Sequence, residues 1–219
     1  MTKICELLDL SKTIAAGLFE GKTYPWEVLP EISAYIEELG KTLPEDEFDY
    51  KGNSVWIAKD AKVFPSAYIG SPCIIDHGAE VRHCAFIRGS AIVGKNAVVG
   101  NSVELKNVVL FDGVQTPHYN YVGDSVLGYK AHMGAGSITS NVKSDKTLVV
   151  VKDPDGEIQT GRKKFGAILG DHVEVGCNSV LNPGTVIGRN SNIYPVSCVR
   201  GVVPENSIYK GKNDIAAKN

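Results

Sequence analysis

Aliphatic residues recur at every sixth position through much of residues 57–199, and this spacing constrains the fold more than any other feature. A period of six fits neither an amphipathic helix nor a simple strand. Two steps of five residues instead of six, from Leu105 to Leu110 and from Val122 to Leu127, and one longer interruption divide the series into blocks that keep the same spacing. Its members are Ile57, Val63, Ile69, Ile75, Val81, Ile87, Val93, Val99, Leu105, Leu110, Thr116, Val122, Leu127, Met133, Leu169, Val175, Leu181, Ile187, Ile193 and Val199. Such spacing is the hexapeptide repeat of a parallel β-helix.

Each hexapeptide is expected to supply one short strand and one turn. The aliphatic side chain points inward, and a small or β-branched residue four positions later fills a corner, as Ala85 and Ala91 do. Three hexapeptides close one triangular coil, and each coil buries its core only against its neighbours. About 20 hexapeptides therefore predict about seven coils.

Composition places this chain among ordinary soluble proteins. Its formal net charge of −2 gives no reason to expect nucleic acid or an anionic membrane as a partner. No apolar run is long enough to span a bilayer, and residues 1–6 lack the hydrophobic region of a signal peptide. The five cysteines form an odd set without a C-x-x-C pair, which is typical of reduced thiols. These features predict a cytoplasmic protein.

The repeat divides the chain into three parts: an N-terminal helical segment at 1–50, the β-helix at 51–205 and a C-terminal tail at 206–219. Apolar spacing in the first part predicts a helix over 3–20 and a second one from Pro25 to Gly40. We expect both to cover the first coils or a neighbouring subunit. A loop at 140–166 interrupts the repeat, and its centre reads as a basic hairpin that turns at Asp153–Gly156.

His118 lies in the most informative short stretch, Thr116–Asp124, where Tyr119, Asn120 and Tyr121 follow it. Histidine is the side chain best suited to take up a proton near neutral pH, so His118 is a candidate general base. A surface histidine stacked on tyrosine is the alternative interpretation of the same residues.

Residues 87–141 resemble the acetyltransferase half of the bifunctional N-acetylglucosamine-1-phosphate uridyltransferases. The matching motifs are Arg88, Val99–Lys106, His118–Asp124 and Gly134–Asn141. The hairpin and Thr160–Gly170 resemble the archaeal-type two-domain sugar-1-phosphate nucleotidylyltransferases. This resemblance implies that the β-helix winds left-handed, against the usual crossover rule.

The resemblance also implies an activity, which is transfer of an acetyl group from acetyl-CoA to the amine of glucosamine 1-phosphate or a similar amino-sugar phosphate. His118 is then the general base. The implied substrate-binding residues are Arg88, Lys106, Tyr121, His132, Asn141 and Lys146. The implied acetyl-CoA contacts are Gly134, Ala135, Cys177, Pro195 and Lys212. The family is expected to work as a homotrimer with the active site between subunits and without a metal.

The chain departs from the family at several positions. His132 stands where the family has a substrate-binding asparagine, Val142 replaces a tyrosine, Cys177 a serine and Lys212 an arginine. The nucleotidyltransferase half is not matched, because only about 50 residues precede the coils and none forms a glycine-rich nucleotide loop. Uridyl transfer is therefore not expected.

Two other functions stay open from the sequence. One is a zinc enzyme similar to the gamma-carbonic anhydrases, although their His-x4-His pair is missing here. The other is a non-catalytic subunit that binds sugar phosphate or CoA and partners a separate nucleotidylyltransferase.

Overall fold

The computed structural model describes residues 2–153, 156–212 and 214–218, and its strands stack into three parallel faces. The first face holds β4 (Tyr68–Ile69), β7 (Phe86–Ile87), β10 (Glu104–Leu110), β12 (Tyr121–Leu127), β14 (Ile138–Thr139), β19 (Val180–Leu181) and β22 (Cys198–Val199). The second face holds β3 (Lys62–Val63), β6 (Glu80–Val81), β9 (Val98–Asn101), β11 (Gln115–His118), β13 (His132–Met133), β18 (Glu174–Val175), β21 (Asn192–Ile193) and β24 (Ser207–Gly211).

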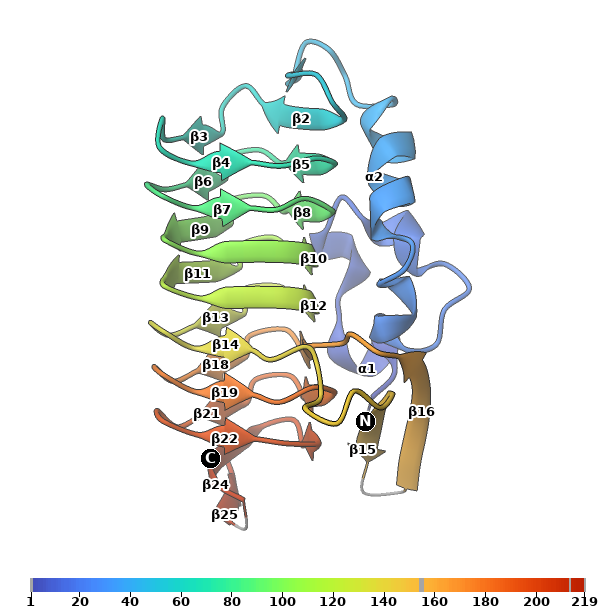
Figure 1. The fold of residues 1–219 in the computed structure, drawn as a ribbon, viewed down its shortest axis with the longest axis vertical. Helices are drawn as coiled ribbons and strands as arrows, with labels where there is room; N and C mark the ends of the chain where they lie inside the picture. Colours follow the sequence, from blue (N-terminus) through green and yellow to red (C-terminus); the bar gives the residue numbers. More distant parts are fainter. Residues whose placement is uncertain (1, 154–155, 213, 219) are drawn as a thin grey trace.

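The third face holds β2 (Val55–Ala58), β5 (Cys73–Ile75), β8 (Ala91–Val93), the second halves of β10 and β12, β17 (Ala167–Leu169), β20 (Thr185–Ile187) and β23 (Val202–Val203). In Figure 1 the strands of the first face run from left to right in front, and the others run back behind them while the chain descends. This winding is left-handed, so the predicted left-handed parallel β-helix is confirmed. The stacked strands make about eight turns, one more than the repeat count predicted.

The repeat residues form the interior of the β-helix. From Ile75 to Val199, the side chains of the series are almost fully buried, whereas Ile57, Val63 and Ile69 of the first coil are only partly buried. The first coil is more exposed because it has a neighbouring coil on one side only. Cys73 lies in this interior, where burial raises the pKa of its thiol to about 12.

The predicted helix over 3–20 is wrong. The structure has α1 (Ile4–Leu7) followed by two short 3-10 helices, Leu10–Lys12 and Ala16–Phe19. Asp9 ends the regular helix, because its carboxylate accepts the Ser11 N–H at 3.0 Å and starts a new turn. The second predicted helix begins as a 3-10 helix at Pro25–Val28 and continues as α2 (Ile32–Gly40).

These N-terminal elements run along the third face. Helix α2 packs against β5, β8 and β10, and Figure 1 shows it beside these strands. Nearer the other end, Asp171 N–H donates to Leu7 O at 3.0 Å. We expected these helices to cover the first coils or a neighbouring subunit; they do cover early coils and also extend along much of the length of the β-helix.

Both ends of the stacked sheets carry an antiparallel strand. Before the first coil, β1 (Phe48–Tyr50) pairs antiparallel with β2. After the last coil, β25 (Asp214–Ala217) pairs antiparallel with β24, so the segment expected as a tail contains two strands.

His77 joins the linker to the first coils, with Nδ1 at 2.9 Å from Asp60 and Nε2 at 3.2 Å from Glu47.

The loop at 140–166 forms the predicted hairpin. Strand β15 (Val149–Asp153) pairs antiparallel with β16 (Gly156–Arg162), and the turn residues 154–155 lie outside the described residues. The loop returns to its start, because Phe165 N–H donates to Asn141 O at 3.0 Å.

Within the described residues, no helix is long and apolar enough to cross a membrane.

Candidate active site on the first face

A buried carboxylate organises the polar part of the first face. Asp124 lies in β12, and its side chain is only 4% exposed. Lys106 of β10 donates to both of its oxygens, at 2.8 and 3.1 Å. Asn107 donates to the same carboxylate at 3.0 Å, and the Asn141 amide donates to its other oxygen. One carboxylate therefore fixes side chains from β10 and from the end of β14.

Tyr121 and Arg88 lie beside this carboxylate. The Tyr121 hydroxyl accepts a hydrogen bond from the Asn141 amide at 3.1 Å. Burial, together with the charges of Asp124 and Glu104, raises the pKa of Tyr121, so its hydroxyl stays protonated near neutral pH. Arg88 follows β7 and pairs with Glu104 Oε1 at 2.9 Å. Arg88, Lys106, Tyr121 and Asn141 thus share one face.

Gly123 provides the space for this arrangement. A Cβ atom at this position would lie 2.5 Å from the Tyr121 hydroxyl and 3.0 Å from the Asn141 amide nitrogen. The first distance is too short for a real Cβ contact and the second is tight, so a side chain here would displace the Tyr121 hydroxyl and press on the Asn141 amide. The amide nitrogen of Asn141 is already used by Tyr121 and Asp124, so its side-chain oxygen is the group left to accept a hydrogen bond from a ligand.

His118 lies at the edge where the second face turns into the first, and its side chain is exposed. The turn is held by buried Asn120, whose side-chain oxygen accepts the His118 N–H at 3.2 Å. The Asn120 amide donates to Gly134 O at 2.9 Å and to Ser137 O at 3.1 Å in the next coil. The backbone that carries His118 is therefore fixed, while its imidazole faces solvent.

Three of the predicted acetyl-CoA residues stack below His118. Gly136 N–H donates to His118 O at 3.0 Å, Asn178 N–H to Ala135 O at 2.9 Å, and Val196 N–H to Cys177 O at 2.9 Å. The same kind of backbone hydrogen bond therefore links each of these coils to the next along this edge. We call His118, Ala135, Cys177 and Pro195 the His118 column.

Gly134 lies beside this column with its backbone groups engaged. Its N–H donates to Val175 O at 2.7 Å, and its carbonyl accepts from Asn120 and Ser137. The Gly134 N–H therefore does not point freely toward a ligand.

Three other predicted residues lie outside the cluster around Asp124. His132 is on the second face, where its Nδ1 lies 2.7 Å from Glu174 Oε2. Lys146 is exposed in a turn of the inserted loop, and Lys212 is exposed in the turn between β24 and β25. Among the described hydrogen bonds and ion pairs, none joins these residues to Asp124.

The sequence reasoning missed Asp124, Asn107 and Asn120. Asn120 had a signal, because it occupies the corner position that other hexapeptides give to a small residue. Asp124 also had one, as the single charge within the run Val122–Leu127. A charged residue inside a strand that is otherwise buried needs partners, and these come from other coils.

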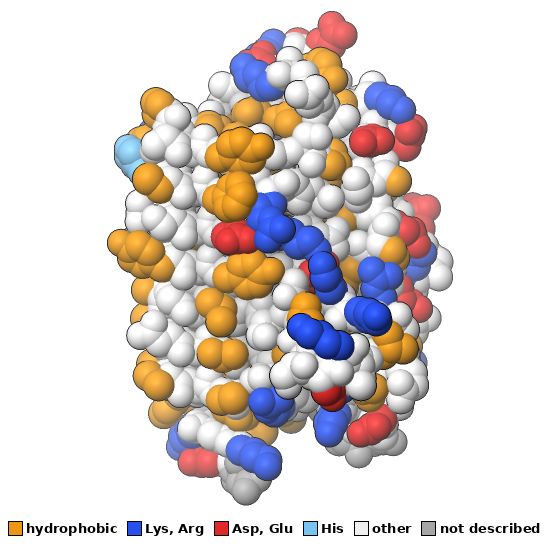
Figure 2. All heavy atoms as spheres, in the orientation of Figure 1, with side chains coloured by type: hydrophobic (Ala, Val, Ile, Leu, Met, Phe, Trp, Pro, Cys, Tyr) orange, Lys and Arg blue, Asp and Glu red, His pale blue; other side chains and the backbone are white. Residues whose placement is uncertain are grey.

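The surface of the first face combines basic and apolar side chains. Figure 2 shows Lys and Arg side chains running diagonally across its middle, next to a vertical line of hydrophobic side chains. The strand register gives the residues of this line as Tyr68, Phe86, Tyr121, Ile138, Val180 and Cys198, with Glu104 between the second and third.

A metal cluster is not formed by the described residues, since no three His, Cys, Asp or Glu side chains there are placed to hold an ion. His77 and His83 have separate surroundings: His77 pairs with Asp60 and Glu47, and the ring of His83 lies 4.3 Å from that of Phe64.

The fold and this face define a hexapeptide-repeat β-helix protein with a charged cluster next to an exposed histidine. Comparison with known proteins gives the family. The chain belongs to the family described as the GMPPB C-terminal domain, whose model matches residues 69–187, more than half of the sequence.

Curated relatives agree with this assignment. The chain is 32% identical over 192 residues to the bifunctional sugar-1-phosphate nucleotidylyltransferase/acetyltransferase of Sulfurisphaera tokodaii, covering 85% of this chain and 47% of that protein. It is 32% identical over 117 residues to the bifunctional protein GlmU of Methanococcus aeolicus, covering 53% of this chain and 28% of that protein. The chain thus spans about half the length of the first of these relatives and less of the second.

A solved structure supports the fold. The polySia specific acetyltransferase NeuO superposes with a TM-score of 0.52 at 15% identity, over 73% of this chain and 80% of that one.

Proposed function

We propose that this protein is an acetyl-CoA-dependent N-acetyltransferase that acts on an amino-sugar phosphate such as glucosamine 1-phosphate. The observation that carries the proposal is the gathering of Arg88, Lys106, Tyr121 and Asn141 around Asp124, in the strand that follows His118. The name of the relative from Sulfurisphaera tokodaii includes an acetyltransferase activity, which is consistent with this assignment.

The proposed reaction follows from these positions. The sugar amine attacks the thioester carbonyl carbon, His118 takes the amine proton, and the carbon–sulfur bond breaks to release the CoA thiolate, which gains a proton. A positioned base of this kind contributes about 10²–10⁴-fold to the rate. Asn141 offers its side-chain oxygen to the amine or a neighbouring hydroxyl of the sugar.

Arg88 and Lys106 are proposed to bind the phosphate. Each already pairs with a carboxylate, Glu104 or Asp124, which fixes its position. An arginine has five N–H donors and a lysine three, so both keep donors for phosphate oxygens. Lys146 from the inserted loop is proposed as a further cation at this site.

Acetyl-CoA is proposed to lie along the His118 column. Its thioester then sits near Gly134 and Ala135, its pantetheine passes Cys177 and Pro195, and Lys212 binds a phosphate group at the far end. Because the Gly134 N–H is used within the coil, the oxyanion needs another donor, and Ala135 N–H is the neighbouring candidate.

We propose a homotrimer with this site between subunits. The apolar line on the first face supports it, because Tyr68 is 60% and Phe86 42% exposed in the single chain. Large exposed apolar side chains aligned along a flat face are typical of protein interfaces.

A thiol-release assay with a panel of amino-sugar 1-phosphates tests the function. We expect CoA release that depends on both acetyl-CoA and the amino-sugar phosphate, with formation of the N-acetyl product. Binding of both ligands without CoA release would instead support the non-catalytic alternative.

Acetyl-CoA is also expected to protect Cys177 from alkylation, because the column places this exposed thiol against the pantetheine. Peptide mapping after brief iodoacetamide treatment measures the rate at each cysteine. Cys84, exposed on an earlier coil, is the matched control and should react equally with and without acetyl-CoA. Equal reaction rates at Cys177 with and without saturating acetyl-CoA would contradict the proposed cofactor position.

A further inference from the structure

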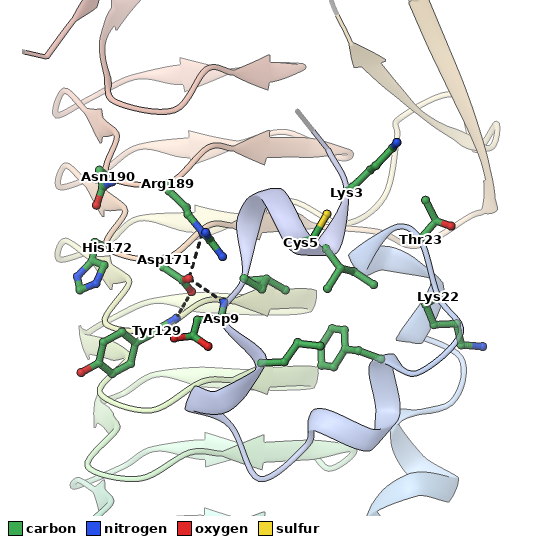
Figure 3. A pocket seen from close by; sticks show the side chains of 14 residues that line it. Lys3, Cys5, Asp9, Lys22, Thr23, Tyr129, Asp171, His172, Arg189 and Asn190 are labelled. Carbon is green, nitrogen blue, oxygen red and sulfur yellow. Dashed lines mark hydrogen bonds and ion pairs between the residues drawn. The ribbon is translucent and has the colours of Figure 1, made fainter.

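A cavity of about 880 Å³ lies between the N-terminal segment and the edge where the third face turns into the second (Figure 3). Tyr129, His172 and Arg189 line it from the turns of successive coils, and residues 3–10 line it from the other side. The cavity shares no lining residue with the cluster around Asp124. Its volume falls in the range of about 300–1,000 Å³ that is usual for small-molecule sites.

Asp171 fixes the two walls of this cavity relative to each other. Its carboxylate accepts Asp9 N–H at 2.8 Å from the N-terminal wall and Tyr129 N–H at 2.8 Å from the coil wall. Arg189 Nε lies 3.2 Å from the same carboxylate, and Figure 3 draws these three contacts together. The walls are therefore held in place before any ligand arrives, which lowers the entropic cost of binding.

Basic groups surround the cavity, with Lys22 in an ion pair with Glu31, and its acidic groups are engaged. Lys3, Lys22 and Arg189 line it, and Lys12 and Lys130 lie 5.6 and 5.1 Å from the centre of the Tyr129 ring. The lining carboxylates accept hydrogen bonds, Asp9 from Ser11 and Asp171 from the backbone as above. Arg189 Nε forms an ion pair with Asp171 without hydrogen-bond geometry, and the two terminal nitrogens of the guanidinium carry its other donors.

The base of the cavity is apolar. Ile4, Leu8 and Phe19 line it and are buried against the coils. Phe19 packs edge-on against Phe111 with ring centroids 5.7 Å apart. The cavity thus combines a basic rim with an apolar base, which suits a ligand that has an anionic end and an uncharged body.

We propose that this cavity binds a phosphorylated small molecule of about nucleotide size. Its phosphates lie against Arg189, and the flexible Lys3 side chain, which Figure 3 draws directed away from Arg189, turns toward them to add a second charge-assisted hydrogen bond. Its uncharged part rests on Ile4, Leu8 and Phe19. Such a ligand contacts both walls, so it stabilises the docking of the N-terminal segment on the coils. The proposal does not rest on the acetyltransferase function.

Binding of UDP, measured by calorimetry and by thermal unfolding, tests the proposal. We expect one saturable site per chain, and weaker binding of pyrophosphate and of uridine, each of which offers only one of the two parts of the ligand. Saturation at about 100 times Kd should raise the unfolding temperature by roughly 5–10 °C, because the ligand binds only the folded chain.

Two variants locate the site. Lys3→Ala and Arg189→Gln should each weaken UDP binding by about 10-fold or more, since each removes a charged donor. Lys41→Ala is the matched control, an exposed lysine outside this cavity, and should bind UDP normally. His118→Ala should also bind normally, which separates this result from the fate of the proposed activity. Absence of saturable binding by UDP and pyrophosphate, or a Kd unchanged in Lys3→Ala and in Arg189→Gln, would overturn the proposal.

Discussion

Replacing His118 with alanine is expected to lower the rate of acetyl transfer by about 10²–10⁴-fold, because the attacking amine loses its proton acceptor. The fold should be retained. The side chain is exposed, and the turn that carries it is held by Asn120 through backbone groups. The rate is measured by thiol release at saturating acetyl-CoA and amino-sugar phosphate.

His83→Ala is the matched control for this variant. His83 occupies the same position two coils earlier, as the hydrogen bonds from Ser102 N–H to His83 O and from Tyr119 N–H to Asn101 O show. The turnover of His83→Ala should stay near that of the unaltered protein. Full activity in His118→Ala, or an equal loss in both variants, would rule out His118 as the general base.

Replacing Asp124 with alanine is expected to lower both stability and turnover. The change leaves the Lys106 ammonium without its partner and removes one hydrogen bond each from Asn107 and Asn141. Breaking a buried ion pair from one side costs about 3–5 kcal/mol. For a chain of this size, that corresponds to a fall in unfolding temperature of roughly 6–20 °C.

Two comparisons separate charge from packing at Asp124. Asp49→Ala removes an exposed carboxylate that pairs with Lys51 at 2.9 Å and should cost no more than about 1 kcal/mol. The double variant Lys106→Met, Asp124→Leu removes both charges and should regain much of the stability but none of the turnover. A melting temperature for Asp124→Ala equal to that of Asp49→Ala would show that Asp124 does not organise this face.

The repeat was sufficient to predict the coils. Apolar residues at every sixth position can be buried together in few arrangements other than a β-helix. The same regularity places residues from different coils beside each other, so Arg88 and Lys106 come together directly, and Tyr121 joins them through the first short step. The N-terminal segment has no such constraint. Its apolar residues at 7, 10, 14 and 18 fit a helix, yet Asp9 and Thr13 offer competing local hydrogen bonds, and contact with the coils decides between them.

The partners of Asp124 could not be predicted from the sequence either, because they depend on the two short steps in the repeat. Each step moves the register of later residues relative to the coil before. The first step sets the pairing of Lys106 with Asp124, and the second sets that of Asp124 with Asn141. The cavity beside Asp171 could not be predicted from the sequence either. One of its walls comes from residues whose apolar spacing predicted a continuous helix.

The antiparallel strands β1 and β25 at the two ends of the β-helix bear on how copies of this chain associate. A stack of parallel strands presents at each end an unfilled row of backbone groups that another copy could extend into a fibre. A strand that arrives in the opposite direction occupies this row and ends the pattern. Growth along the helix axis through the edges of β2 and β24 is thereby disfavoured, which is consistent with the proposed association through the flat sides of the prism.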